Sequence, residues 1–157
     1  MSTQFGSLPQ TEYARVRTLV SASPEQCYDV VADIASYPDW AHGITGVDII
    51  ELDDLGRVLI ARFEAEAIGR RTRYVLRYDY SKAPMAVRWS QVSGDLTTRV
   101  DGAYTFTPSA DDPEATEVSY ELSIGLAMPL PGFVKRRAEA KIVEAALGKF
   151  RARIENL

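Results

Sequence analysis

The sequence is poor in the residues that build most metal and nucleophile sites. Its 157 residues include one cysteine, Cys27, and one histidine, His42. A single cysteine excludes a disulfide within the chain and a zinc site made of several cysteines. A single histidine leaves little material for a histidine-based metal centre or a Ser-His-Asp triad. We therefore expect no metal and no cofactor, and the sequence assigns no catalytic residue.

Long apolar runs are also missing. No segment approaches the roughly 18 apolar residues of a membrane span, and the amino terminus has neither a basic leader nor an apolar run of signal-peptide length. Hydrophobic residues make up 46% of the chain and charged residues 25%, a balance typical of a soluble globular domain. We expect a cytoplasmic protein without stable membrane insertion.

Basic residues are scarce except near the carboxyl terminus. Residues 1–132 carry 11 basic and 19 acidic side chains, a balance of −8, whereas residues 133–157 carry 7 basic and 3 acidic ones, a balance of +4. Because duplex binding usually needs a broad basic face, no nucleic-acid partner is expected. The basic segment leaves transient contact with an anionic membrane surface open.

The amino-terminal part predicts a strand followed by two short helices. Residues 1–12 form a flexible lead-in to a single domain over residues 13–157, which begins with an alternating strand over residues 13–20. Ser23 and Gln26 have the spacing of a capping box, which predicts that a helix starts there. A second short turn or helix is expected at Tyr37-Pro38-Asp39-Trp40.

Residues 47–128 show a period of two, with turn signals every dozen residues or so. The pattern predicts five or six antiparallel strands with one covered face and one solvated face. The covered face is aromatic but also contains small residues; it includes Ala61, Phe63, Ala65, Tyr74, Tyr78, Trp89, Gln91, Gly102, Tyr104, Phe106 and Tyr120.

Residues 133–157 contain no proline and predict one long helix, which would span roughly 37 Å and could cross a curved sheet. Its expected apolar stripe consists of Val134, Ala138, Ile142, Ala145, Ala146, Phe150, Ile154 and Leu157. The chain thus predicts an α+β fold.

Three segments carry a resemblance to a known family. They are Ala22-Ser23-Pro24-Glu25 with Cys27-Tyr28-Asp29-Val30-Val31 and Asp33-Ile34, then Tyr37-Pro38-Asp39-Trp40, and Met128-Pro129-Leu130-Pro131 before the last helix. With this order of elements, the chain resembles the START-like superfamily, which includes the polyketide cyclase/dehydrase and lipid-transport family and the coenzyme Q-binding proteins. The resemblance implies a helix-grip fold, in which a curved antiparallel sheet of about seven strands wraps around a long carboxyl-terminal helix, with two short helices after the first strand.

The resemblance further implies a cavity between the sheet and the long helix for an apolar or aromatic ligand. The candidate ligand-binding residues are Trp40, Phe63, Tyr74, Tyr78, Trp89, Gln91, Tyr104, Phe106, Tyr120, Leu126 and Ile142. Each aromatic residue among them is either cavity wall or packed core, and Gln91 either satisfies a backbone group or binds a ligand carbonyl. His42 is either a surface residue or an acid–base group at the cavity mouth. Arg70, Arg71 and Arg73 form a solvated rim or attract an anionic ligand.

Three functions fit these residues. The first is a carrier or sensor, a monomer or weak homodimer, that binds a lipid, an isoprenoid quinone or a polyketide-like aromatic molecule. The second is an aromatase or cyclase that folds a poly-β-ketone chain in the same cavity. In that case a few of Tyr74, Tyr78, Tyr104 and His42 would handle protons. The third is an interaction protein that docks through the solvated face of its sheet, although mixed charges on that face favour plain solvation.

Overall fold

The computed structural model describes residues 13–67 and 69–157; the expected lead-in over residues 1–12 lies outside them. The elements in chain order are β1 (Ala14–Val20), α2 (Pro24–Ala32), the 3-10 helix η2 (Ile34–Ser36), α3 (Tyr37–Trp40), β2 (Ile44–Leu52), β3 (Val58–Ala67), β4 (Arg70–Asp79), β5 (Ala86–Gly94), β6 (Thr97–Pro108), β7 (Thr116–Leu126) and α4 (Gly132–Glu155). This order confirms the predicted strand, two short helices, strand series and long final helix.

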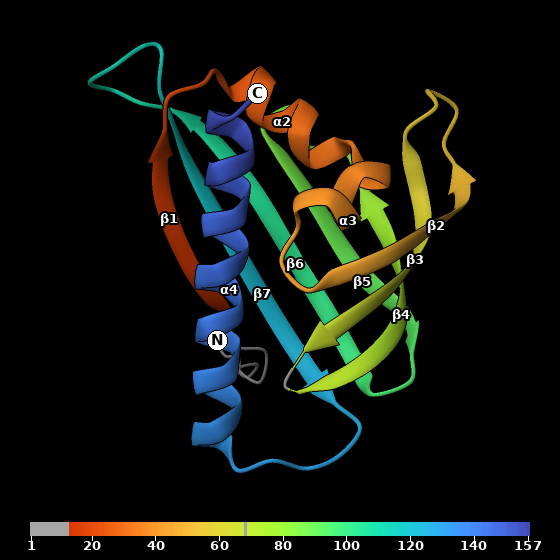
Figure 1. Ribbon diagram of the computed structural model, residues 1–157. Helices are drawn as coiled ribbons and strands as arrows, with labels where there is room; N and C mark the ends of the chain where they lie inside the picture. The colour runs from red at the N-terminus through yellow and green to blue at the C-terminus, as the bar shows by residue number, and fades with distance from the viewer. Residues whose placement is uncertain (1–12, 68) are drawn as a thin grey trace, which may run out of the picture.

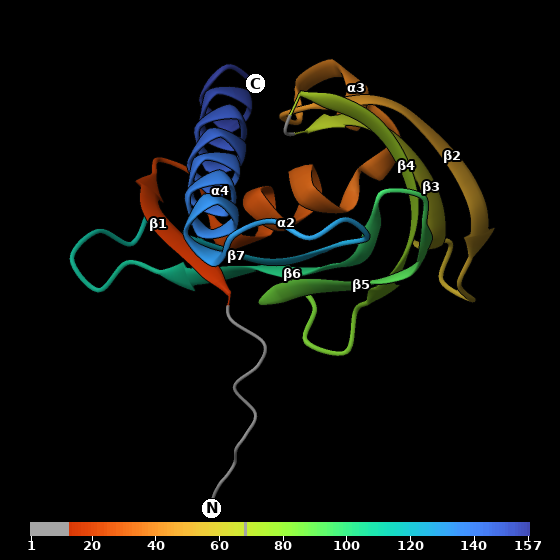
Figure 2. The same ribbon diagram turned by 90° about the horizontal axis from the view of Figure 1, so that it is seen from below.

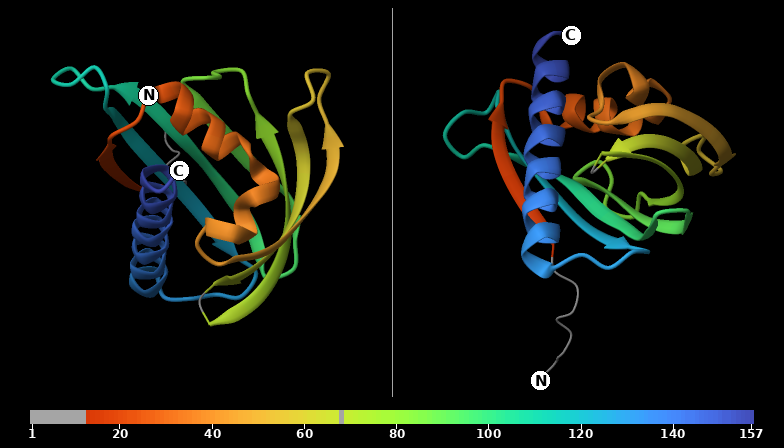
Figure 3. Two further views of the ribbon diagram at one scale, coloured as in Figure 1. Left: turned by 45° about the horizontal axis from the view of Figure 1, so that its top comes forward. Right: turned by 60° about the horizontal axis from the view of Figure 1, so that its bottom comes forward.

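The seven strands form one antiparallel sheet in the order β1-β7-β6-β5-β4-β3-β2. Consecutive strands are neighbours from β2 to β7, and β1 closes the other edge beside β7. The sheet curves strongly, with α4 against its β1–β7 side and α2 and α3 across the concave face (Figures 1 and 2). This is the expected helix-grip arrangement, which Figure 3 shows from two further directions.

Local sequence explains where α2 begins. The Ser23 hydroxyl accepts a hydrogen bond from the Gln26 backbone N–H at 3.1 Å, and the Gln26 side chain accepts one from the Ser23 N–H at 2.9 Å. Both bonds of the predicted capping box are therefore present. Cys27 and Val31 lie on the buried face of this helix and are fully buried. Burial raises the pKa of the Cys27 thiol to about 11.

The predicted apolar stripe of α4 is wrong in part. The buried residues of the helix are Glu139, Val143, Leu147, Phe150 and Ile154, whereas Val134 and Leu157 are 37% and 76% exposed. Hydrophobicity alone misplaced the stripe because the first of its buried residues, Glu139, is acidic. The Glu139 carboxylate accepts a hydrogen bond from the Ile124 backbone N–H of β7 at 2.8 Å. It also lies 3.8 Å from the Lys135 ammonium.

The apolar residues of α4 face two different surroundings. One side of the helix packs on β1 and β7. Ile142 and Ala146 are half-buried and line a cavity instead. The helix therefore packs on the sheet through its buried residues and contributes Ile142 and Ala146 to the cavity wall.

Candidate functional site

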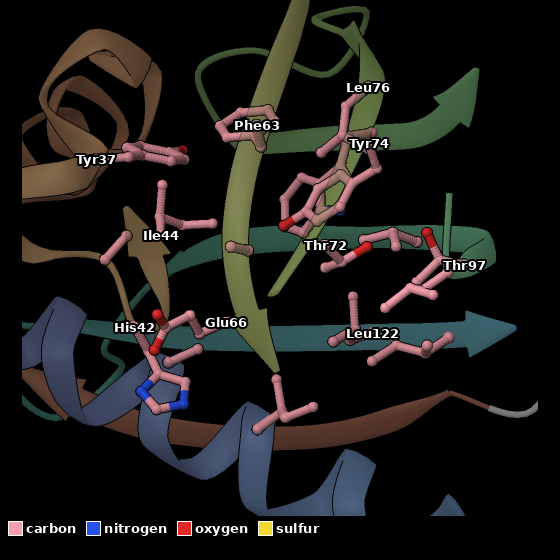
Figure 4. Close-up of a pocket in the computed structure, with 18 of the residues that line it drawn as sticks. Tyr37, His42, Ile44, Phe63, Glu66, Thr72, Tyr74, Leu76, Thr97 and Leu122 are labelled. Carbon is pink, nitrogen blue, oxygen red and sulfur yellow. The ribbon is translucent and has the colours of Figure 1, made fainter. Parts of the chain in front are cut away.

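A cavity of about 480 Å³ lies between the concave face of the sheet, α3 and α4. Small-molecule sites typically measure about 300–1,000 Å³, so this cavity has the size of a ligand-binding site. Its wall comes from β2 to β7 on the sheet side, from the α3 region, and from Ile142 and Ala146 of α4. Figure 4 shows side chains from several of these elements converging on one space.

Stacked and tilted aromatic rings form much of the wall. Trp89 lies 5.8 Å from both Tyr104 and Tyr120, measured between ring centroids, and 6.1 Å from Tyr78. Tyr104 and Tyr120 stack at 4.7 Å. Phe63 of β3 pairs with Tyr74 of β4, and their rings stack at 5.7 Å. These ring contacts involve residues from five strands, β3 to β7, and give the sheet side of the cavity an aromatic surface.

A glycine makes room for the central ring. Gly102 of β6 pairs directly with Trp89 of β5. A Cβ atom at Gly102 would lie 2.6 Å from the Trp89 ring and 2.5 Å from the Glu121 carbonyl oxygen. The glycine therefore lets the indole lie flat on the backbone of the neighbouring strand.

The cavity also contains hydrogen-bond donors. Tyr74, Tyr78, Tyr104 and Tyr120 line it, and burial raises the pKa of each phenol above its usual value. Each hydroxyl therefore stays protonated at neutral pH and can donate a hydrogen bond. Within the part of the chain that the structure describes, the buried Trp89 indole N–H has no hydrogen-bond partner.

Nine of the eleven candidate residues line the cavity, so the structure brings them together. They are Trp40, Phe63, Tyr74, Tyr78, Trp89, Tyr104, Tyr120, Leu126 and Ile142. Their contact with a ligand remains a prediction, because position in a wall is not binding.

The other two candidates do not line the cavity. The Gln91 side chain donates a hydrogen bond to the Thr97 carbonyl oxygen at 2.8 Å and accepts one from the Thr97 hydroxyl at 2.7 Å. Of its two expected roles, the structure therefore shows the backbone-satisfying one. Phe106 is 1% exposed and lies in the core, stacked on Tyr104 at 6.2 Å near the end of β6 that contacts α2.

The mouth of the cavity is polar. His42 and Glu66 are exposed lining residues that lie near each other in Figure 4, and the exposed Arg70 also lines the cavity. Glu66 and Arg70 lie on the adjoining ends of β3 and β4. His42 is thus an exposed residue at the mouth, and an acid–base or gate role there stays a prediction.

Sequence reasoning left several wall residues out. Tyr37 lies in the quoted Tyr-Pro-Asp-Trp motif, and its hydroxyl donates a hydrogen bond to the Val31 carbonyl oxygen. Thr72 is in phase with Tyr74 along β4, so strand alternation is the signal that could have identified it. Leu96, Met128 and Leu130 come from turns and a loop, where no periodic pattern indicates direction.

These features define a class of protein: a START-like helix-grip domain with an apolar cavity between its sheet and its last helix. Residues 20–151 match the family described as "Polyketide cyclase / dehydrase and lipid transport", and the chain belongs to this family. No curated protein sequence matches the chain significantly.

Solved structures with the same fold include proteins with different described roles. A START superfamily protein from Mycobacterium smegmatis is 22% identical, with a TM-score of 0.85 and coverage of 92% of this chain and 97% of the other. The ZhuI aromatase/cyclase from Streptomyces sp. R1128 is 17% identical, with a TM-score of 0.76 and coverage of 94% and 95%. A STAR-related lipid transfer protein from Xanthomonas axonopodis is 17% identical, with a TM-score of 0.68 and coverage of 90% and 84%.

Proposed function

We propose that this protein binds one hydrophobic or aromatic small molecule in the cavity and acts as its carrier or sensor. The observation that carries the proposal is a cavity of about 480 Å³ with stacked aromatic walls. Apolar walls with a few convergent polar groups are typical of small-molecule sites. The family contains lipid-transport proteins by its description, which agrees with this role.

The donors in the cavity favour a ligand with acceptor oxygen atoms. The four protonated phenols that line the cavity can donate hydrogen bonds. Carbonyl groups of a quinone or a polyketide-like aromatic molecule would accept them, whereas a saturated acyl chain would leave the donors unpaired. Within the lipid, quinone and polyketide classes, we therefore favour the oxygenated aromatic ones.

A panel of ligands tests this choice. Purified protein is mixed with a fatty acid, an isoprenoid quinone or an aromatic polyketide, and binding is followed by native mass spectrometry and thermal shift. A ligand that binds only the native state raises Tm as its concentration exceeds Kd. We expect the quinone or polyketide to give the larger shift. Indifference to all three classes would refute the proposal.

Matched variants test the place of binding. Ala65 is 4% exposed and lines the cavity, so Ala65→Phe puts a ring into the empty space. Ile142→Trp fills it from the helix side in case the first variant folds poorly. Ala110→Phe adds the same ring as the first variant to an exposed position between β6 and β7. We expect the two cavity variants to lose the ligand-induced shift and Ala110→Phe to keep it.

The second candidate function is an aromatase or cyclase that acts on a poly-β-ketone chain in the same cavity. The raised pKa values of the tyrosines favour donation of protons over their removal. The imidazole of His42 and the carboxylate of Glu66, which also line the cavity, are both exposed at its mouth. Co-expression with a minimal polyketide synthase separates the candidates: an altered product pattern supports the enzyme, and an unchanged one supports the carrier or sensor.

A further inference from the structure

The start of α4 and the loop before it expose large apolar side chains. Phe133 is 62% exposed, Met128 43% and Val134 37%. Together they occupy one end of the molecule, where the β7–α4 loop meets the first turn of the helix (Figure 1). Single exposed apolar residues are ordinary on protein surfaces, but three within seven positions form a local apolar patch.

Basic side chains follow this patch along α4. Arg136, Arg137 and Lys141 are exposed, and the ion pairs found in residues 13–67 and 69–157 include none of the three. Phe133, Arg137 and Lys141 follow at i, i+4 and i+8, so they share one side of the helix. The exposed N-terminal end of α4 adds its own partial positive charge. Lys135 differs, because it faces the buried Glu139 carboxylate.

We propose that this region docks on an anionic membrane surface. We call it the α4 tip and define it as Met128, Phe133, Val134, Arg136, Arg137 and Lys141. The apolar side chains would enter the boundary between headgroups and acyl chains, while the cations contact lipid phosphates. A bilayer fits better than a protein partner because exposed apolar residues lie next to cations without an ion-pair partner among the described residues, the pattern of interfacial helices.

The position of the α4 tip gives the docking a consequence for the cavity. Met128, which belongs to the α4 tip, also lines the cavity. Leu130, in the same loop but outside the α4 tip, lines the cavity as well. Docking would therefore bring the loop beside the cavity mouth into contact with the bilayer, the solvent from which an apolar ligand is most easily taken up. The docking itself does not depend on which ligand the cavity binds.

Vesicle binding tests the inference. The full chain is mixed with vesicles of phosphatidylcholine alone or of phosphatidylcholine with phosphatidylglycerol, and the bound fraction is measured by flotation. We expect binding to the anionic vesicles that weakens as salt is added. No binding to the anionic vesicles, or equal binding to both kinds, would overturn the inference.

Two variants of the α4 tip and one matched control locate the contact. Arg136→Glu with Arg137→Glu should weaken binding at least about tenfold, since one cation near an anionic surface contributes roughly fivefold. Phe133→Ser should weaken it while leaving the charge unchanged. Arg77→Glu with Arg88→Glu makes the same change in net charge at exposed positions of β4 and β5. If this control loses as much binding as the tip variant, binding depends on the net charge of the protein and docking through the α4 tip is refuted.

The test also separates this inference from the proposed function. The tip variants leave Ala65, Trp89 and the tyrosines of the cavity unchanged, so the thermal shift by a dissolved ligand should persist in them. A protein that binds ligand in solution but ignores anionic vesicles would refute the docking alone.

Discussion

The buried carboxylate of Glu139 should hold α4 against the sheet. Its exposed fraction is 5%, and it accepts a hydrogen bond from the Ile124 backbone N–H at 2.8 Å. The register shows why this N–H needs an acceptor: β1 pairs with β7 from Ala14 opposite Leu122, two residues before Ile124. In Glu139→Ala the N–H stays buried without this acceptor, and Lys135 loses its partner at 3.8 Å.

The expected cost follows from these contacts. A buried donor left without an acceptor costs roughly 1–3 kcal/mol. The desolvation of the carboxylate and the better helix propensity of alanine offset part of it. We expect Glu139→Ala to lower the free energy of unfolding by about 2 kcal/mol. For a chain of this length that corresponds to a Tm lower by roughly 4–8 °C.

Urea denaturation and differential scanning calorimetry measure this loss. Glu139→Gln keeps an acceptor oxygen and should lose less stability than Glu139→Ala. Glu144→Ala removes an exposed carboxylate from the same helix and should stay within about 0.5 kcal/mol of the parent. If Glu139→Ala is as stable as Glu144→Ala, the anchoring role of this hydrogen bond is refuted.

Three further predictions concern the sheet and the cavity. Gly102→Ala should lower stability by about 1–3 kcal/mol in urea denaturation because its Cβ would overlap the Trp89 ring and a carbonyl oxygen, and an unchanged midpoint would refute the close approach. Gln91→Leu removes two hydrogen bonds to Thr97 and should cost about 1–2 kcal/mol while leaving the ligand-induced thermal shift intact; a lost shift would assign Gln91 to the ligand. Stability should fall as pH rises above about 9, because the pKa of Cys27 is raised to about 11 from 9.0 and those of Tyr37, Tyr74, Tyr78, Tyr80, Tyr104 and Tyr120 are raised as well. The unfolded chain releases these protons at lower pH than the folded chain, so the free energy of unfolding decreases as pH rises in this range. The six phenols should therefore ionise, which is measured as absorbance near 295 nm, only as the protein unfolds.

Much of the fold was predictable because its local signals agree with its long-range packing. The Ser23–Gln26 capping box places the start of α2 without reference to the rest of the chain. Strand alternation places Phe63, Tyr74 and Trp89 on the concave face. The apolar side chains on that face need an element to cover them, and the long helix at residues 132–155 is the element available to do so.

The parts that sequence reasoning missed depend on where elements end and cross. Phe106 has the same phase as Tyr104 but lies further along β6, where α2 covers the sheet and leaves no space. Hydrophobic periodicity could not reveal that the buried stripe of α4 passes through Glu139, because the backbone N–H that it satisfies belongs to β7. The wall residues Leu96, Met128 and Leu130 lie in a turn and a loop, where alternation gives no direction.

Intrinsic fluorescence tests the binding cavity most directly. The chain has two tryptophans, Trp40 and Trp89, and both line the cavity. Titration with an isoprenoid quinone, whose ring quenches indole emission on contact, should give saturable quenching that is lost in Ala65→Phe and kept in Ala110→Phe. Emission that stays constant, or that falls equally in the parent and in Ala65→Phe, would contradict binding inside the cavity.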